Sequence, residues 1–303
     1  MKIYERSLIE GLSFALDVAE KNYFSHSKHV AYTSFLLAKE LDLPKEQQKN
    51  IYYGALLHDI GVGNSYTMEE HCMVGHGIIQ GLPMEQSIAE AVLYHHEYQD
   101  GTGPFHLTAG KIPLAAQIIC LANFFDISFI QRKKVTYDLT QEIDQWIHKN
   151  EALFYTSLVN AFEALIKKEY FLLDYYNNEF NCILSKRIII EENILDFDKV
   201  KLYAEAFSKI IDNRSKFTYH HSLGIAEIVN KVTKALGYSN EIQNKMHIAA
   251  LLHDIGKLAV SKEIIEKDGP LTEQERFEIN KHTYYTRWIL EQITGFEDIT
   301  DNL

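Results

Sequence analysis

The chain has 303 residues, of which 46% are apolar and 24% charged, a composition typical of folded globular proteins and long enough for two domains. The formal net charge of −12 argues against a DNA-binding surface, which normally carries a basic stripe. Three scattered cysteines argue against a disulfide framework. The sequence also lacks an apolar signal core and any apolar run of the ~18–20 residues that a membrane helix needs. We therefore expect a cytoplasmic protein that binds neither DNA nor a membrane.

Few prolines and glycines interrupt the chain, and apolar residues recur at helical spacing, so we expect an all-α protein. The stretch from His26 has Val30, Leu37 and Leu41 on one face, which predicts a helix that stops at the Leu-Asp-Leu-Pro segment. The next segment, "QQKNIYYGALLHDIG", predicts a helix whose last turn carries a His-Asp pair and which ends on Gly61 as its capping glycine.

Later segments complete the first half of the chain. The stretch "EYQDGTGP" predicts a turn, because Asp-Gly and Gly-Pro steps disfavour regular structure. Helices are expected over about Pro113–Phe129 and over "FYTSLVNAFEALIKKEY". Residues 171–198 are rich in aromatic side chains and poor in glycine, and we interpret them as a helical linker outside the domain core, with aromatic side chains that could contact a second subunit in a homodimer.

The chain contains an internal duplication. The heptapeptide "ALLHDIG" occurs at 55–61 and again at 250–256, an offset of 195 positions. The same offset places His26 on His221, so each copy has a histidine 32 residues before its His-Asp pair. Repetition over this length predicts two related units.

Histidines and one aspartate are concentrated in the first unit. Imidazole and carboxylate ligands together suit Zn, Mn, Fe or Ni. A buried Asp59 is costly unless it is paired or binds a metal, whereas the structural alternative is a capping pair made by His58 and Asp59. We interpret His76 and His106 as structural. The sequence therefore predicts a metal site built on His58 and Asp59.

The ordered motifs resemble those of the HD superfamily of metal-dependent phosphohydrolases, in particular its HD-GYP branch. The segments that carry the resemblance are "HSKHV", "HDIG", "HCMVG", "HHEYQDGTGPF" and "IPLAAQIICLANFFD". The resemblance implies two HD-type helical bundle domains, an HD-GYP-like domain at 1–170 and a second HD domain at 199–303 that is incomplete at its C-terminus, joined by the linker at 171–198. It also implies hydrolysis of cyclic di-GMP, with two divalent transition metal ions (Fe, Mn, Ni or Zn) as cofactors.

The resemblance implies a role for each site residue. Asp59 would bridge the two metals and, with His58, would be catalytic. The metal ligands would be His26, His58, Asp59, Asn123, His71, His95 and His96. Asp100 and Arg132 would bind substrate, although Arg132 could equally be a solvated charge in a basic run. The matching candidates in the second unit are His221, His253, Asp254, Lys257 and His282.

The first unit also departs from the family pattern. Val62 replaces the lysine of "HDIGK", Pro104-Phe105 replaces Tyr-Pro, Asn123 replaces a metal-binding aspartate, and Asn22 replaces a glutamate that some relatives use for a third metal. These departures motivate a second hypothesis, a catalytically impaired module that binds a cyclic dinucleotide or a partner protein. A third hypothesis is an HD-type nucleotidase that acts on another nucleotide.

Overall fold

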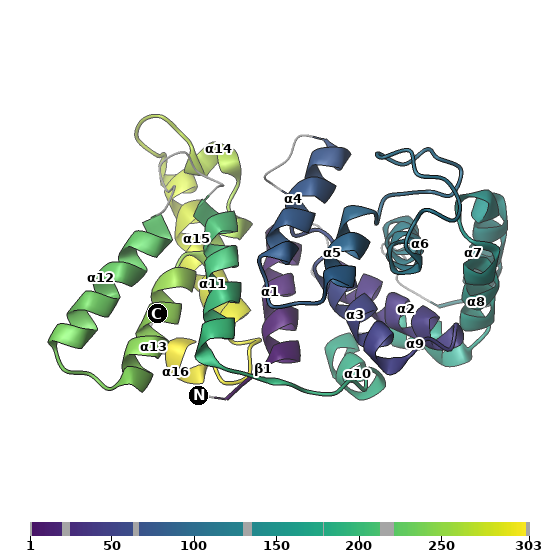
Figure 1. Ribbon diagram of the computed structural model, residues 1–303. Helices are drawn as coiled ribbons and strands as arrows, with labels where there is room; N and C mark the ends of the chain where they lie inside the picture. Colours follow the sequence, from purple (N-terminus) through teal and green to yellow (C-terminus); the bar gives the residue numbers. More distant parts are fainter. Residues whose placement is uncertain are drawn as a thin grey trace.

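Nearly all regular structure of the chain is helical (Figure 1). The computed structural model describes residues 2–19, 25–62, 67–129, 135–177, 179–212 and 221–300. Within these ranges the only paired strands are β1 (Ile3–Tyr4) and β2 (Ile194–Leu195), which form a short antiparallel ribbon. The expected all-α fold class is confirmed.

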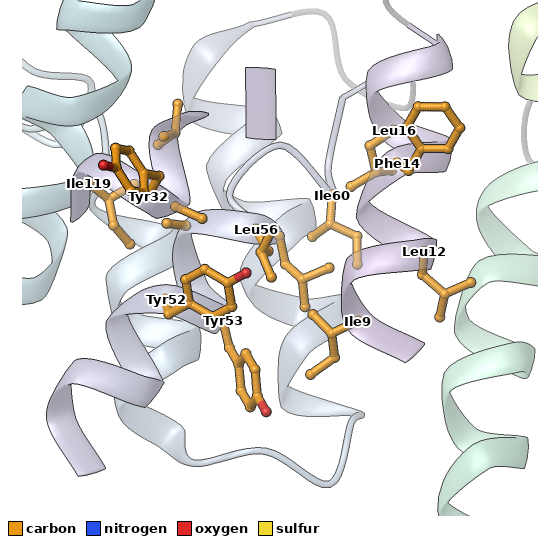
Figure 2. Close-up of a cluster of buried hydrophobic side chains, with 14 of the residues drawn as sticks. Ile9, Leu12, Phe14, Leu16, Tyr32, Tyr52, Tyr53, Leu56, Ile60 and Ile119 are labelled. Atoms are coloured by element: carbon orange, nitrogen blue, oxygen red, sulfur yellow. The ribbon is translucent and has the colours of Figure 1, made fainter. Parts of the chain in front are cut away.

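The first unit consists of the helices that surround the first His-Asp pair. Its elements are α1 (Glu5–Ala19), α2 (His26–Glu40), α3 (Lys45–Leu56), α4 (Met68–Gln80), α5 (Gln86–Leu93), α6 (Leu114–Phe129), α7 (Tyr137–Asn150), the 3₁₀ turn η1 (Glu151–Leu153), α8 (Thr156–Ile166), α9 (Glu169–Tyr175) and α10 (Phe180–Arg187). Helix α2 lies at the centre and packs against α1, α3, α6 and α8. Figure 2 shows apolar side chains such as Ile9, Leu56 and Ile119 in the core that these helices share.

The second unit repeats the first four helices with insertions. Its elements are α11 (Phe197–Asp212), α12 (His221–Ala235), α13 (Asn240–Leu252), the 3₁₀ turn η2 (Ile255–Ala259), α14 (Lys262–Ile265), α15 (Glu273–Leu290) and α16 (Glu297–Thr300). Helices α12 and α13 begin 195 residues after α2 and α3, respectively, so the duplication seen in the sequence is a duplication of structure.

The His-Asp pairs lie beyond their helices, not in the last turn as expected. Helix α3 ends at Leu56, and α13 ends at Leu252. After Leu56 the chain makes tight turns, in which Ile60 N–H donates to Leu57 O at 3.0 Å and Val62 N–H donates to Asp59 O at 2.9 Å. These turns aim two consecutive side chains at one place, which a regular helix could not do because its neighbours diverge by about 100°.

Gly61 and Gly256 are glycines because another backbone lies against them. Neither has the positive φ of a left-handed capping residue, so the expectation that Gly61 caps the helix was wrong. A Cβ atom on Gly61 would overlap the carbonyl oxygen of His71, and one on Gly256 would overlap that of His282. The two glycines therefore let α4 and α15 bring these histidines up to the His-Asp turns.

The segment expected to be a linker packs inside the first unit. Phe171, Tyr175, Phe180 and Leu184 are buried in the core that the first unit's helices form. Tyr175 stands 5.3 Å from Phe125 of α6, measured between ring centroids. The interpretation of these aromatics as lying outside a domain core was therefore wrong, and they are covered by their own chain. The domain limits and the homodimer stay predictions.

Helix α1 joins the two units. It contacts α2 and α3 on one side and α15 and η2 on the other. The rings of Phe14 and Trp288 meet edge to face at 4.8 Å, and a Cβ on Gly11 would overlap the side chain of Ile293. The two units therefore share one continuous core.

We expect Gly61→Ala and Gly256→Ala to lower the free energy of unfolding by about 1–3 kcal/mol each, because the added methyl meets a backbone atom that cannot move alone. Gly77→Ala is the matched control: it lies within α4 with nothing within 4 Å of its Cβ position and should raise stability by up to about 1 kcal/mol. Urea denaturation of the three variants measures the difference. Equal stability of Gly61→Ala and Gly77→Ala would contradict the close approach.

Candidate metal centre

Two buried aspartates hold the first turns of the helices that carry His26 and His221. Asp17 Oδ1 accepts hydrogen bonds from Ser27 N–H at 2.9 Å and from Ser27 Oγ–H at 2.7 Å. Asp212 accepts the same pair of bonds from Ser222, at 3.1 and 2.9 Å. Each carboxylate thus satisfies an N–H at the helix N-terminus that has no intrahelical partner. The sequence analysis missed both, although the offset of 195 relates Asp17 to Asp212.

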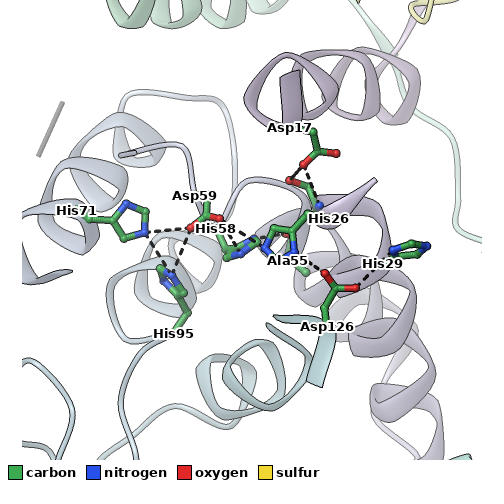
Figure 3. Close-up of polar contacts among 10 residues, drawn as sticks. Asp17, His26, His29, Ala55, His58, Asp59, His71, His95 and Asp126 are labelled. Carbon is green, nitrogen blue, oxygen red and sulfur yellow. Dashed lines mark hydrogen bonds and ion pairs between the residues drawn. The ribbon is translucent and has the colours of Figure 1, made fainter. Parts of the chain in front are cut away.

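Four histidines converge on Asp59 (Figure 3). Asp59 Oδ2 lies 3.2 Å from His58 Nε2 and 3.6 Å from His26 Nε2. The other oxygen, Oδ1, lies 3.2 Å from His71 Nε2 and 3.9 Å from His95 Nε2. The two oxygens of one carboxylate therefore face two different pairs of imidazoles.

Backbone carbonyls fix the orientation of two of these rings. His58 Nδ1–H donates to Ala55 O at 2.8 Å, and His95 Nδ1–H donates to Val92 O at 2.6 Å, each three residues back along the chain. A carbonyl that accepts the proton of Nδ1 leaves Nε2 as the atom with the free lone pair. In both residues this is the atom that faces Asp59.

His26 is oriented by a carboxylate that the sequence analysis missed. Its Nδ1–H donates to Asp126 Oδ2 at 2.5 Å, and Asp126 is fully buried on α6. The signal in the sequence was an aspartate within the apolar stretch "ANFFDIS", three residues after Asn123. Residues three apart lie on the same side of a helix, so Asn123 lies on the side of α6 that carries Asp126.

The residues present fit divalent transition metal ions. Ligand atoms lie within 4.8 Å of one another in a first group of His26, His58 and Asp59 and in a second group of His71, Cys72, His95 and His96. His58 Nε2, His71 Nδ1 and Asn123 Oδ1 are buried and make no hydrogen bond to the described residues. Buried polar atoms of this kind are costly, and a coordinated cation would satisfy His58 and Asn123. Cys72, which the sequence analysis did not select, contributes a buried thiol to the second group.

The protonation states of Asp59 and His96 also favour a cation, whereas His26 would have to release a proton to bind one. Burial opposes charge on His26, but its hydrogen bonds to Asp126 and Asp59 outweigh burial and raise the pKa of His26 to about 11. Burial likewise disfavours the charged form of Asp59, yet the electrostatic attraction of the neighbouring His58 and the hydrogen bonds from His26 and His71 hold the pKa of Asp59 well below its usual value. Burial lowers the pKa of His96 to about 4, so this imidazole is neutral and able to bind a metal at pH 7.

The predicted substrate-binding residues of the first unit are Asp100 and Arg132, and only Asp100 lies within the described residues. Exposed Asp100 accepts hydrogen bonds from Thr102 N–H at 3.0 Å and Thr102 Oγ1–H at 2.7 Å, so its contacts lie within its own turn. Its role in substrate binding stays a prediction. Arg132 and Asn22 lie outside the described residues. His106 has a positive φ of 56° in the same loop as Asp100, and its structural role stays a prediction.

A buried glutamate shapes the loop that follows His96. Glu97 is fully buried, and its carboxylate accepts hydrogen bonds from Phe105 N–H at 2.7 Å and Leu107 N–H at 2.6 Å. A Cβ on Gly103 would overlap this carboxylate. Pro104 and Phe105, which replace the Tyr-Pro of the family pattern, therefore lie in a loop whose backbone is hydrogen-bonded to Glu97.

The second unit has a smaller cluster in which a lysine takes part. His221, His253 and Asp254 form its possible metal-binding group. Lys257 Nζ donates to Asp254 Oδ2 at 2.6 Å, and His282 Nε2 lies 3.7 Å from Asp254 Oδ1. The residue of the first unit that corresponds to Lys257 is Val62. At this position the first unit therefore has no lysine that could pair with Asp59 in competition with the histidines.

Comparison with known proteins adds a family. The family described as "HD domain" matches residues 23–126, and a second family of that description matches residues 205–302. No described helix is both long and apolar enough to span a membrane.

Three curated relatives are phosphodiesterases. The 3'3'-cGAMP-specific phosphodiesterase 1 of Vibrio cholerae is 26% identical over 93% of this chain and 70% of its own length. The 3'3'-cGAMP-specific phosphodiesterase 3 of the same species is 27% identical over 78% of this chain and 52% of its own length. A cyclic di-GMP phosphodiesterase of Thermotoga maritima is 26% identical over 57% of this chain and 51% of its own length.

One solved structure has the same fold. The crystal structure of a cyclic GMP-AMP-specific phosphodiesterase of V. cholerae superposes with a TM-score of 0.78, covering 100% of this chain and 82% of that chain at 23% identity. The two-unit arrangement is therefore one that a solved structure also adopts.

We expect Asp17→Asn to remove a pH dependence of stability. Burial raises the pKa of Asp17 to about 6, so the folded chain holds this proton more tightly than the unfolded chain does. The stabilising contribution is complete below the unfolded pKa of ~4 and is lost as the pH rises through about 6. The unfolding free energy of the variant, relative to the wild type, should therefore rise by about 2 kcal/mol between pH 4 and pH 7.

Urea unfolding of the metal-free chain at several pH values measures this difference. Asp138→Asn, at an exposed position, is the control and should follow the wild type at every pH. A constant difference between Asp17→Asn and the wild type would contradict the expected titration.

Proposed function

The chain belongs to the HD superfamily of metal-dependent phosphohydrolases, and we propose that it is a phosphodiesterase that hydrolyses a cyclic dinucleotide at the cluster around Asp59. The observation that carries the proposal is the position of Asp59, whose Oδ2 faces His58 and His26 while its Oδ1 faces His71 and His95. A carboxylate so placed is suited to bridge two cations, the arrangement used for phosphoester hydrolysis.

The proposed ligands divide between the two sides of Asp59. His26, His58 and Asn123 would hold one cation, and His71, His95 and His96 would hold the other. Divalent metal ions bound there would supply activated water and would stabilise the charge that develops on the phosphoryl oxygens. The carbonyls of Ala55 and Val92 keep the Nε2 atoms of His58 and His95 directed at the cluster, so the ligands need little rearrangement.

The proposed substrate class comes from the relatives. Enzymes named for 3'3'-cGAMP align with most of this chain, and an enzyme named for cyclic di-GMP aligns with 57% of it. We therefore propose 3'3'-cGAMP and cyclic di-GMP as the substrates to compare, because both present the same pair of phosphodiesters to the metals.

Binding without hydrolysis is a second candidate function. The observation in its favour is Asn123, whose amide oxygen stands where the family resemblance implies a carboxylate. A neutral oxygen attracts a divalent cation less than a carboxylate does. Tight nucleotide binding with no product under any metal would support this candidate and contradict the first.

We expect treatment with a chelator to abolish hydrolysis and added Mn²⁺ or Fe²⁺ to restore it. His58→Ala and Asp59→Asn should each lower kcat/KM at least about 100-fold, because each removes a group from the cluster. The matched control is His148→Ala, which removes a histidine that is 55% exposed on α7 and should leave activity unchanged. Product release is followed by chromatography, and metal content by elemental analysis of the same samples. Activity that survives His58→Ala would refute the assignment.

We expect Asn123→Asp to tighten Mn²⁺ binding about tenfold, because it introduces a charged ligand at a buried position. Asn123→Ala, which removes the oxygen, should weaken binding. Calorimetric titration of the metal-free chain gives both affinities. If neither substitution changes the affinity, Asn123 is not a ligand.

A further inference from the structure

Helix α9, from the segment expected to be a linker, reaches the metal centre through Asp126. Tyr175 is buried on α9, and its hydroxyl donates a hydrogen bond to Asp126 Oδ1. The other oxygen of Asp126 accepts the Nδ1 proton of His26 at 2.5 Å. One fully buried carboxylate is therefore held from two sides, by a phenol and by an imidazole.

His26 takes its hydrogen-bond acceptor from another helix because it lies at the start of α2. His58 and His95 are oriented by carbonyls three residues earlier in the chain. His26 is the first residue of α2, and the N-terminus of a helix presents N–H groups rather than carbonyls. The acceptor of its Nδ1 proton comes from another helix and is Asp126 of α6.

The surroundings keep Asp126 in place. The Tyr175 ring stacks on His29, with centroids 4.3 Å apart and planes 20° from parallel, and it also meets Phe125 of α6. His29 Nδ1 lies 3.4 Å from Asp126 Oδ1, next to the Tyr175 hydroxyl. Asp126 therefore has charged or polar partners at both oxygens and can stay ionised although it is buried.

The second unit shows the contrast. Position 29 corresponds to Gly224, and the described ion pairs of His221 involve Asp254 alone. The His221 side chain is 43% exposed, compared with 7% for His26. Without a helix that corresponds to α6 or α9 in the described part of this unit, His221 is held less tightly than His26.

We propose that Asp126 and Tyr175 are positioning residues, which orient His26 Nε2 toward the cation that Asp59 and His58 would share. This inference rests on the proposed function for the identity of the site, but it concerns metal binding rather than the substrate. Groups that hydrogen-bond to a ligating histidine typically change metal affinity or activity about 10–100-fold when they are altered.

The test is Mn²⁺ titration of the metal-free full chain by calorimetry. Every sample carries Asp254→Asn, so that the carboxylate of the second-unit cluster does not contribute. Asp126→Asn should weaken binding about 10–100-fold, and Tyr175→Phe, which keeps the ring, should weaken it several-fold. The matched control is Tyr176→Phe, because the neighbouring hydroxyl donates to the carbonyl of Phe129 at 2.9 Å and not to Asp126. It should bind Mn²⁺ with unchanged affinity.

A double-mutant comparison separates positioning from general destabilisation. In a His26→Ala background, Tyr175→Phe should have no further effect on Mn²⁺ affinity, because the group that it positions is gone. Thermal unfolding of each variant checks that it folds. Unchanged affinity in Asp126→Asn, equal losses in Tyr175→Phe and Tyr176→Phe, or additive losses in the His26→Ala background would each overturn the proposal. A wild-type chain that binds Mn²⁺ but hydrolyses no cyclic dinucleotide would instead refute the proposed function alone.

Discussion

The first unit is organised around one buried negative charge. Asp59 has only about an eighth of its side chain exposed, and a carboxylate in such a place is stable only if its neighbours supply compensating charge or hydrogen bonds. Four imidazoles from the start of α2, the turn after α3, helix α4 and the turn after α5 provide them. Residue 61 is a glycine because the backbone of α4 lies against it, and this close approach brings His71 up to Asp59.

The aspartates of the two heptapeptides are neutralised by different groups. In the second unit the aspartate is neutralised by Lys257, three residues further along the same turn. In the first unit the corresponding residue is Val62, so the neutralising charge must come from histidines or from bound cations. Both aspartates face imidazoles with both oxygens, but Asp59 has no lysine from its own turn among its partners.

Much of this arrangement could be predicted from the sequence. The all-α class follows from helical periodicity, and the duplication follows from the repeated heptapeptide. The resemblance to the HD superfamily implied that His26, His58, His71 and His95 gather around Asp59, as the structure shows. Asp126 and Tyr175 were not predicted, because their partners are distant in sequence and only folding brings them together. Asp17 and Glu97 were missed as well, although their partners are only 8 to 10 residues away. Asp17 would have been the easiest of these to predict, since the same offset that aligned the histidines also aligns it with Asp212.

The expected linker shows why composition alone misleads. A stretch without metal ligands that is rich in tyrosine and phenylalanine reads as a connection, yet Tyr175 and Phe180 pack on α2 and α6. Aromatic side chains bury a large area and also carry polar ends, so one segment can fill a core and hydrogen-bond within it.

Helix α1 makes the two units of the duplication depend on each other. Twelve of its fifteen residues are buried, because one side faces α2 and α3 and the other faces α15 and η2. If either unit were removed, the apolar residues of α1 that face it would be exposed to water. Selection acting on either half therefore also restrains the sequence of the other.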